Sequence, residues 1–244
     1  MTESAKEAEQ DRAAAERLVR HKLIDRIYHW LMAASVLVLL VTSFFPILGV
    51  KFAWVTIHWI AGLVLTATVL YHIVRALVWQ DRSAMAIGRR DARDAWRSIQ
   101  QFLGRSDAAP PKAGKYSLLQ KLYHYAAAAV VLLTVATGAA MLAKIDTPFW
   151  RRDPYWLSDQ AWGLVYVVHG LAALCAVTLV MAHVYFAVRP EKLLFTRSMI
   201  RGWITRKEYQ EHHDPERWAA FEAVDPPRKP AQDAVHPAGA PTES

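Results

Sequence analysis

The sequence predicts an all-α integral membrane protein, a four-helix bundle whose N- and C-termini are both cytoplasmic. Three observations predict this class: apolar residues occur in long blocks, basic residues gather in alternate gaps between the blocks, and histidines lie inside them. Apolar residues make up 54% of the 244 residues, yet the mean hydropathy is only +0.09. The two values agree because the charged residues are concentrated between the blocks.

Four blocks contain no Asp, Glu, Lys or Arg, namely Ile27–Val50, Phe52–Val74, Leu122–Ala143 and Gln160–Val188. Each is longer than the roughly 20 apolar residues that a helix needs to cross the hydrocarbon core. A soluble bundle is the alternative, but its buried helices are rarely apolar on every face over this length. We expect the first block to be a retained helix and not a cleaved signal, because 26 mostly polar residues precede it.

The basic residues give the expected orientation. Of the 29 Lys and Arg residues, 25 fall in the N-terminal segment, the long middle loop and the C-terminal tail, and 4 fall in the two other loops. Positive charge marks the cytoplasmic side of a membrane protein. A net charge of +7 distributed in this way indicates membrane topology and lipid head groups, and it excludes nucleic-acid binding.

The expected organisation has one membrane domain with polar segments on both sides. A polar segment, residues 1–20, precedes a domain at 21–190 with helices at about 24–47, 52–78, 117–143 and 159–188. A surface helix is expected at about 92–102, a cytoplasmic surface helix at 191–223 and a disordered tail at 224–244. The single cysteine, Cys175, excludes an iron–sulfur site and covalent haem attachment on this chain.

Six of the ten histidines lie within or at the ends of the blocks: His29, His58, His72, His124, His169 and His183. Ionisable residues inside a bilayer are costly, so they indicate function. His169 and His183 are 14 residues apart, which is just under four helical turns and about 21 Å along one helix face. His58 and His72 have the same separation. Imidazoles from different helices can therefore meet in two layers.

A b-type haem takes an axial ligand on each side of its iron. His58 with His169 would form an outer site, and His183 with either His29 or His72 would form an inner one. His124 is expected to be an interfacial or quinone-pocket residue. The remaining histidines, in polar segments, are expected to be solvated: His21, His212, His213 and His236. The rival hypothesis is a haem-free transporter or anchor that uses the histidines for protons or metal.

Several segments resemble a known family: Arg20–Trp30 (RHKLIDRIYHW), Gly114–Lys121 (GKYSLLQK), Val168–Ala172 (VHGLA) and the tail from Ser198 to His213. Over residues 18–222 the chain resembles the cytochrome b (gamma) subunit of membrane-bound formate dehydrogenases. The wider group includes cytochrome b subunits of nickel–iron hydrogenases and thiosulfate reductases, so another donor enzyme of this kind is the main alternative.

The resemblance implies a multi-pass subunit of the bacterial inner membrane that holds two haems b and anchors an iron–sulfur subunit. That partner would receive electrons from a molybdenum- or tungsten-dependent catalytic subunit. The chain itself would carry no substrate chemistry beyond quinone reduction. Matching motifs imply His58 and His169 for the outer haem and His29 and His183 for the inner haem, with His72 as the alternative to His29.

Two positions depart from the family pattern. His72 stands where the formate dehydrogenase subunits have no histidine. Ser117 follows Gly-Lys-Tyr where the family often has Asn beside the quinone, and Ser117 and Gln120 are the expected quinone contacts.

Overall fold

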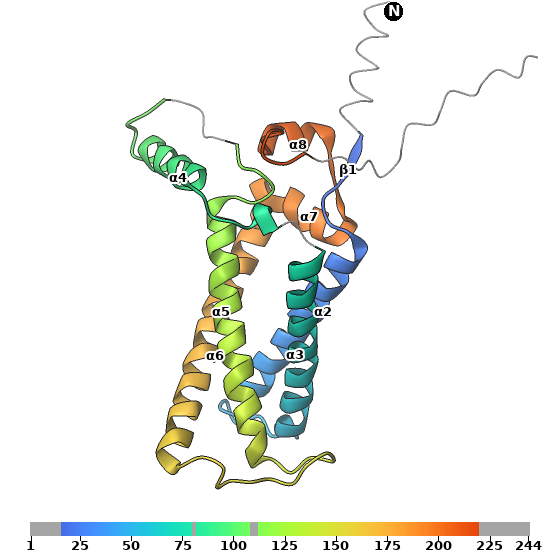
Figure 1. Ribbon diagram of the computed structural model, residues 1–244, viewed down its shortest axis with the longest axis vertical. Coiled ribbons are helices and arrows are strands. Elements are labelled where there is room, and N and C mark those ends of the chain that lie inside the picture. The colour runs from blue at the N-terminus through green and yellow to red at the C-terminus, as the bar shows by residue number, and fades with distance from the viewer. Residues whose placement is uncertain (1–15, 80–81, 108–111, 220–244) are drawn as a thin grey trace, which may run out of the picture.

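Four long helices dominate the computed structural model, which describes residues 16–79, 82–107 and 112–219 (Figure 1). They are α2 (Leu23–Phe44), α3 (Trp54–Val78), α5 (Leu118–Met141) and α6 (Asp159–Val188). All four are long and apolar enough to cross a membrane. Few of their side chains are buried inside the protein, as expected of helices that face lipid. The prediction of an all-α membrane bundle is confirmed.

The four spans pack as two hairpins. α2 packs mainly against α3 and α5 against α6, while α3 and α5 join the two pairs. Their ends follow local rules. Ser117 caps α5 through a reciprocal capping box with Gln120, and the Ser158 hydroxyl accepts a hydrogen bond from the Ala161 amide at the start of α6.

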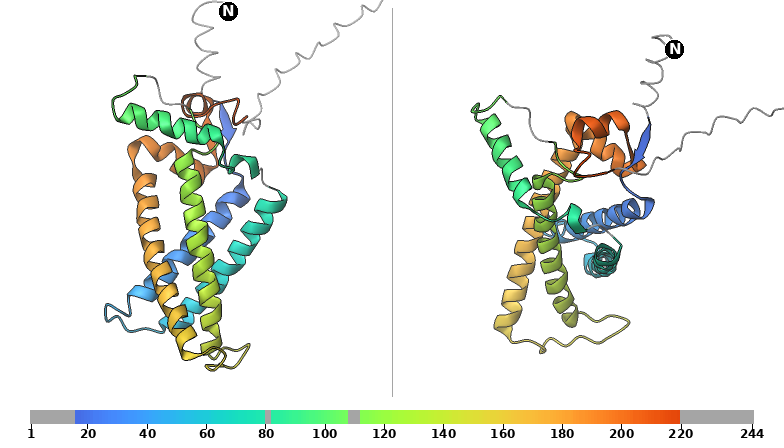
Figure 2. Two further views of the ribbon diagram at one scale, coloured as in Figure 1. Left: turned by 60° about the vertical axis from the view of Figure 1, so that its left-hand side comes forward. Right: turned by 45° about the horizontal axis from the view of Figure 1, so that its top comes forward.

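One end of the bundle carries most of the remaining regular elements of the described chain (Figures 1 and 2). We call it the cap end. It has strands β1 (Arg17–Val19) and β2 (Trp203–Thr205) and helices α4 (Arg89–Phe102), α7 (Leu193–Arg201) and α8 (Arg206–His212). Short 3-10 turns lie at Arg82–Ala84 and Pro190–Lys192. The opposite end, the loop end, has two irregular loops and a 3-10 turn at Leu142–Lys144.

The expectation of one surface helix over 191–223 is wrong. Within its described part the chain forms α7, then β2, then α8. Gly202 ends α7 with a φ of +93°, a conformation that glycine adopts without a steric penalty. The polar segment 1–20 also contains structure, since its residues 17–19 pair antiparallel with β2. The tail at 224–244 lies outside the described residues.

A small core and a buried polar network hold the cap end together. Leu18 and Ile204, which face each other across the two strands, form an apolar cluster with Tyr209. Beside it the buried guanidinium of Arg20 donates to His213 Nε2 at 2.6 Å, and His213 Nδ1 donates to the Gly114 carbonyl at 2.7 Å. Three segments far apart in the sequence therefore meet at one histidine.

Ion pairs attach α4 to the bundle. Asp91 pairs with Lys121 of α5 and with Arg217 of the C-terminal segment, both at 3.1 Å. The side chains of Asp91 and Lys121 are each only 7% exposed. A second cross-link, Arg75 to Asp25 at 2.6 Å, joins the cap ends of α3 and α2.

Candidate haem sites

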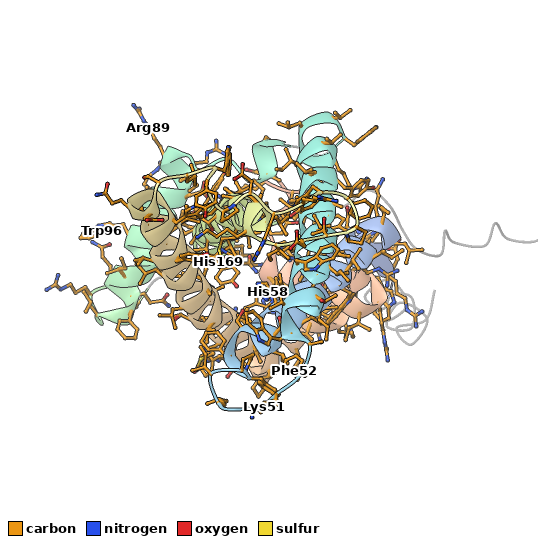
Figure 3. The ribbon with its side chains drawn as sticks, turned by 90° about the horizontal axis from the view of Figure 1, so that it is seen from below. Lys51, Phe52, His58, Arg89, Trp96 and His169 are labelled. Carbon is orange, nitrogen blue, oxygen red and sulfur yellow. The ribbon has the colours of Figure 1, made fainter. Side chains whose placement is uncertain are left out.

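The first histidine pair lies toward the loop end and joins α3 to α6. The ring centroids of His58 and His169 are 6.4 Å apart. Seen from the loop end, the two side chains lie close together between the helices, whereas Arg89 and Trp96 lie on the outside (Figure 3). We call His58 and His169 the loop-side pair.

The second pair lies toward the cap end and joins α2 to α6. The ring centroids of His29 and His183 are 6.2 Å apart. Tyr123 of α5 stacks on the His183 ring at 5.4 Å and donates its hydroxyl to the Leu179 carbonyl. We call His29 and His183 the cap-side pair. Because His169 and His183 are both on the continuous helix α6, the two pairs occupy separate layers about 21 Å apart.

Both separations fit a metal ion held between two imidazoles. A ring nitrogen binds a first-row metal at about 2.0 Å, so two rings on opposite sides of one ion have centroids roughly 6 Å apart. The donor set, one imidazole from each of two helices, is that of a six-coordinate haem b.

Hydrogen bonds fix the ring orientation in the loop-side pair. Thr42 Oγ1 lies 2.8 Å from His58 Nδ1, and Thr137 Oγ1 lies 2.8 Å from His169 Nδ1. A metal-bound histidine commonly donates a hydrogen bond from the N–H of its other ring nitrogen to an oxygen acceptor. With Nδ1 engaged on each ring, the Nε2 lone pair of each histidine is free for iron.

A glycine makes room for one of these rings. A Cβ added to Gly138 of α5 would stand 3.3 Å from His169 Cε1. The absence of a side chain therefore lets the imidazole lie directly against the α5 backbone, next to Thr137. Gly62 and Gly170, the other small residues beside the histidines, have no such close neighbour.

A comparison with family models identifies the family of the chain. A family model described as prokaryotic cytochrome b561 matches residues 20–202, which is most of the chain. The chain belongs to the prokaryotic cytochrome b561 family. Among curated proteins, none matches the sequence. Membership makes this chain a multi-pass membrane cytochrome b, a class that binds haem b and transfers electrons within redox complexes.

His72 and His124 form a third pair in this cytochrome b. Their ring centroids are 6.0 Å apart, and the Tyr28 ring lies 5.0 Å from His72. His72 Nδ1 is buried without a hydrogen-bond partner among the described residues. The structure therefore brings His183 together with His29 and brings His72 together with His124.

The expected quinone contacts have a structural role in this cytochrome b. Ser117 Oγ accepts from the Gln120 amide at 3.4 Å, and Gln120 Oε1 accepts from the Ser117 amide at 2.9 Å. These bonds cap α5. The side-chain nitrogen of Gln120 takes part in neither bond, so it can still donate a hydrogen bond. Gln120 is exposed.

One histidine expected to be solvated is buried. His213 is 2% exposed, and burial together with the Arg20 guanidinium lowers its pKa to about 4. The prediction for His213 is wrong because the C-terminal segment folds back onto the cap end. His236 lies outside the described residues.

Three residues beside the pairs were not predicted: Thr42, Thr137 and Tyr123. A search by depth could have found the threonines, since each lies near the loop end of its helix, where His58 also lies. Threonine hydroxyls in membrane helices usually form hydrogen bonds to the backbone of their own helix. The sequence therefore offered no reason to expect that these two also contact histidines.

Proposed function

We propose that this chain is the membrane-anchoring dihaem cytochrome b subunit of a formate dehydrogenase-like complex. It would pass electrons from an iron–sulfur subunit through two haems b to the quinone pool. Family membership supports the haem and the electron transfer. The observation that carries the dihaem arrangement is the pair of histidine layers, each with ring centroids just over 6 Å apart.

His58 and His169 would ligate the loop-side haem, and His29 and His183 the cap-side haem. Each bound haem supplies a one-electron carrier whose potential the protein sets through ligands and burial. The His29 assignment is supported over His72 by the 6.2 Å approach of His29 to His183 and by the pairing of His72 with His124.

We place the cap end in the cytoplasm of a bacterial cell, with the chain in the inner membrane. The cap end carries the described parts of the N-terminal segment, the middle loop and the C-terminal segment. In the full sequence these three segments hold 25 of the 29 basic residues. The iron–sulfur subunit and its molybdenum- or tungsten-dependent partner would then dock at the loop end. Quinone would be reduced at the cap end, near Gln120, Ser117 and His124.

The test uses membranes that contain the intact complex. Formate should reduce the haem b, read by its absorbance bands, and added quinone should reoxidise it. A nickel–iron hydrogenase partner predicts reduction by hydrogen instead, and that result would replace formate dehydrogenase with the alternative complex. A purified chain without reduced-minus-oxidised b-type bands would contradict the proposal in all its forms and favour the haem-free transporter or anchor.

A further inference from the structure

The two histidine pairs differ in what lies behind their rings. Each ring of the loop-side pair has a threonine hydroxyl 2.8 Å from Nδ1. Among the residues that the structure describes, neither His29 nor His183 has a side-chain hydrogen bond of this kind, and the cap-side rings instead contact aromatic rings. The same donor set thus has two different surroundings within one chain.

The direction of the threonine bonds follows from the hydroxyl protons. Thr42 Oγ1 donates its single proton to the Val38 carbonyl at 2.7 Å, so toward His58 it can only accept. Thr137 Oγ1 donates to the Leu133 carbonyl, also at 2.7 Å. Each imidazole Nδ1–H is therefore the donor. Thr42 is 2% exposed, so water does not compete at that bond.

A ring that donates from Nδ1 becomes more basic at Nε2. A more basic axial ligand stabilises the ferric over the ferrous state and lowers the reduction potential. We propose that Thr42 and Thr137 are positioning residues that lower the potential of the loop-side haem below that of the cap-side haem, and so set the direction of electron flow toward the cap end. This inference rests on the proposed dihaem function and adds its thermodynamic direction.

The balance involves one electron and no proton. With haem bound, His58 and His169 would hold the electron donor and His29 and His183 the electron acceptor, and the two groups would supply one-electron chemistry. The Nδ1–H protons stay on His58 and His169, because each threonine hydroxyl is far too weak a base to take a second proton. The two hydroxyls shift this equilibrium and take no part in bond breaking.

The test is a mediated redox titration of the purified full chain, read by haem absorbance and by electron paramagnetic resonance. Thr42→Val and Thr137→Val each remove one acceptor and keep the side-chain shape. Each should raise the loop-side potential, with a roughly tenfold change in the equilibrium between the two haems, or about 59 mV for one electron. The cap-side potential and the haem content should stay unchanged.

Two further variants separate hydrogen bonding from packing. Thr42→Ser keeps the hydroxyl and should keep the wild-type potential. Thr66→Val is the matched control, because the Thr66 hydroxyl donates to the Gly62 carbonyl of its own helix, and it should shift neither haem.

Unshifted potentials in both valine variants would overturn the proposal, as would a serine variant that shifts as far as valine. Loss of the loop-side haem in both valine variants would also overturn it, since the hydroxyls would then hold the haem and not set its potential. A chain that binds no haem at all would instead contradict the proposed function, so the two failures are distinguishable.

Discussion

The loop end and the cap end of the bundle are stabilised by different means. Toward the loop end, the hydroxyls of two threonines on membrane helices orient the rings of His58 and His169. The ion pair of Arg152 with Asp146, in the loop, is exposed. At the cap end, the ion pair of Asp91 and Lys121 is buried between α4 and the first turn of α5, and the histidine rings contact aromatic rings. Hydrogen bonds therefore orient the rings of the loop-side pair, whereas the rings of the cap-side pair contact Trp30 of α2 and Tyr123 of α5.

The assignment of the cap-side ligands gives the largest expected effect. His29→Ala should remove one of the two haems, because His183 would then have no partner across the iron. His72→Ala should leave both haems in place. Pyridine haemochrome analysis of the purified variants measures this difference. Retention of both haems in His29→Ala together with loss of one in His72→Ala would assign the cap-side site to His72.

The buried ion pair at the cap end should matter far more than the exposed one at the loop end. Lys121→Met leaves Asp91 buried with Arg217 as its remaining cationic partner, and we expect a loss of about 3 kcal/mol in the free energy of unfolding. Arg152→Gln is the matched control, and it should cost at most about 0.5 kcal/mol. Unfolding in mixed detergent micelles measures both values. Equal losses of unfolding free energy in the two variants would show that the ion pairs at the two ends contribute equally to stability.

Gly138 should affect the loop-side site alone. Gly138→Ala places a methyl group 3.3 Å from His169 Cε1, so the ring or α5 has to shift by a few tenths of an ångström. The loop-side haem signal in electron paramagnetic resonance should broaden or disappear while the cap-side signal persists. Gly170→Ala, whose added Cβ meets nothing within 4 Å, should leave both signals intact. Loss of the cap-side signal in the Gly138 variant would argue against the separation of the two layers.

A further expected effect is a dependence of the stability of the cap end on pH. The pKa of His213 is lowered from 6.5 to about 4, so the unfolded chain binds a proton more readily than the folded one. The stabilisation is fully present above about pH 6.5. It is lost as the pH falls toward 4.

Hydrogen-exchange protection of the Leu18 and Arg20 amides, which face β2, should decrease over this range once it is corrected for intrinsic rates. His213→Leu should reduce the dependence, whereas His212→Ala, at an exposed neighbouring position, should not. Protection that is constant from pH 7 to 4 in the wild type would contradict the role of His213.

The membrane spans could be predicted from the sequence because charge-free blocks of more than 20 residues are rare outside membrane-crossing helices. The two-layer arrangement of His58, His169 and His183 also follows from spacing, since 14 residues return to the same face of a helix. The cap could not be predicted in this way. Its strands are three residues long, and pairing Arg17–Val19 with Trp203–Thr205 depends on contacts across nearly the whole chain.

The sequence could not decide whether His29 or His72 pairs with His183, for a similar reason. Both residues lie about four turns from the loop-side layer, and depth alone cannot separate them. The rotation of α2 and α3 about their axes decides which ring faces His183, and side-chain packing between the helices determines that rotation.

The most direct test of the account is the haem content of four purified chains: the wild type, His169→Ala, His183→Ala and the double variant. Two layers of paired imidazoles predict two haems per chain in the wild type, one in each single variant and none in the double variant. The single variants should also differ in the potential of the haem that remains. A wild type with one haem or none, or single variants that both keep two, would contradict the two-layer arrangement.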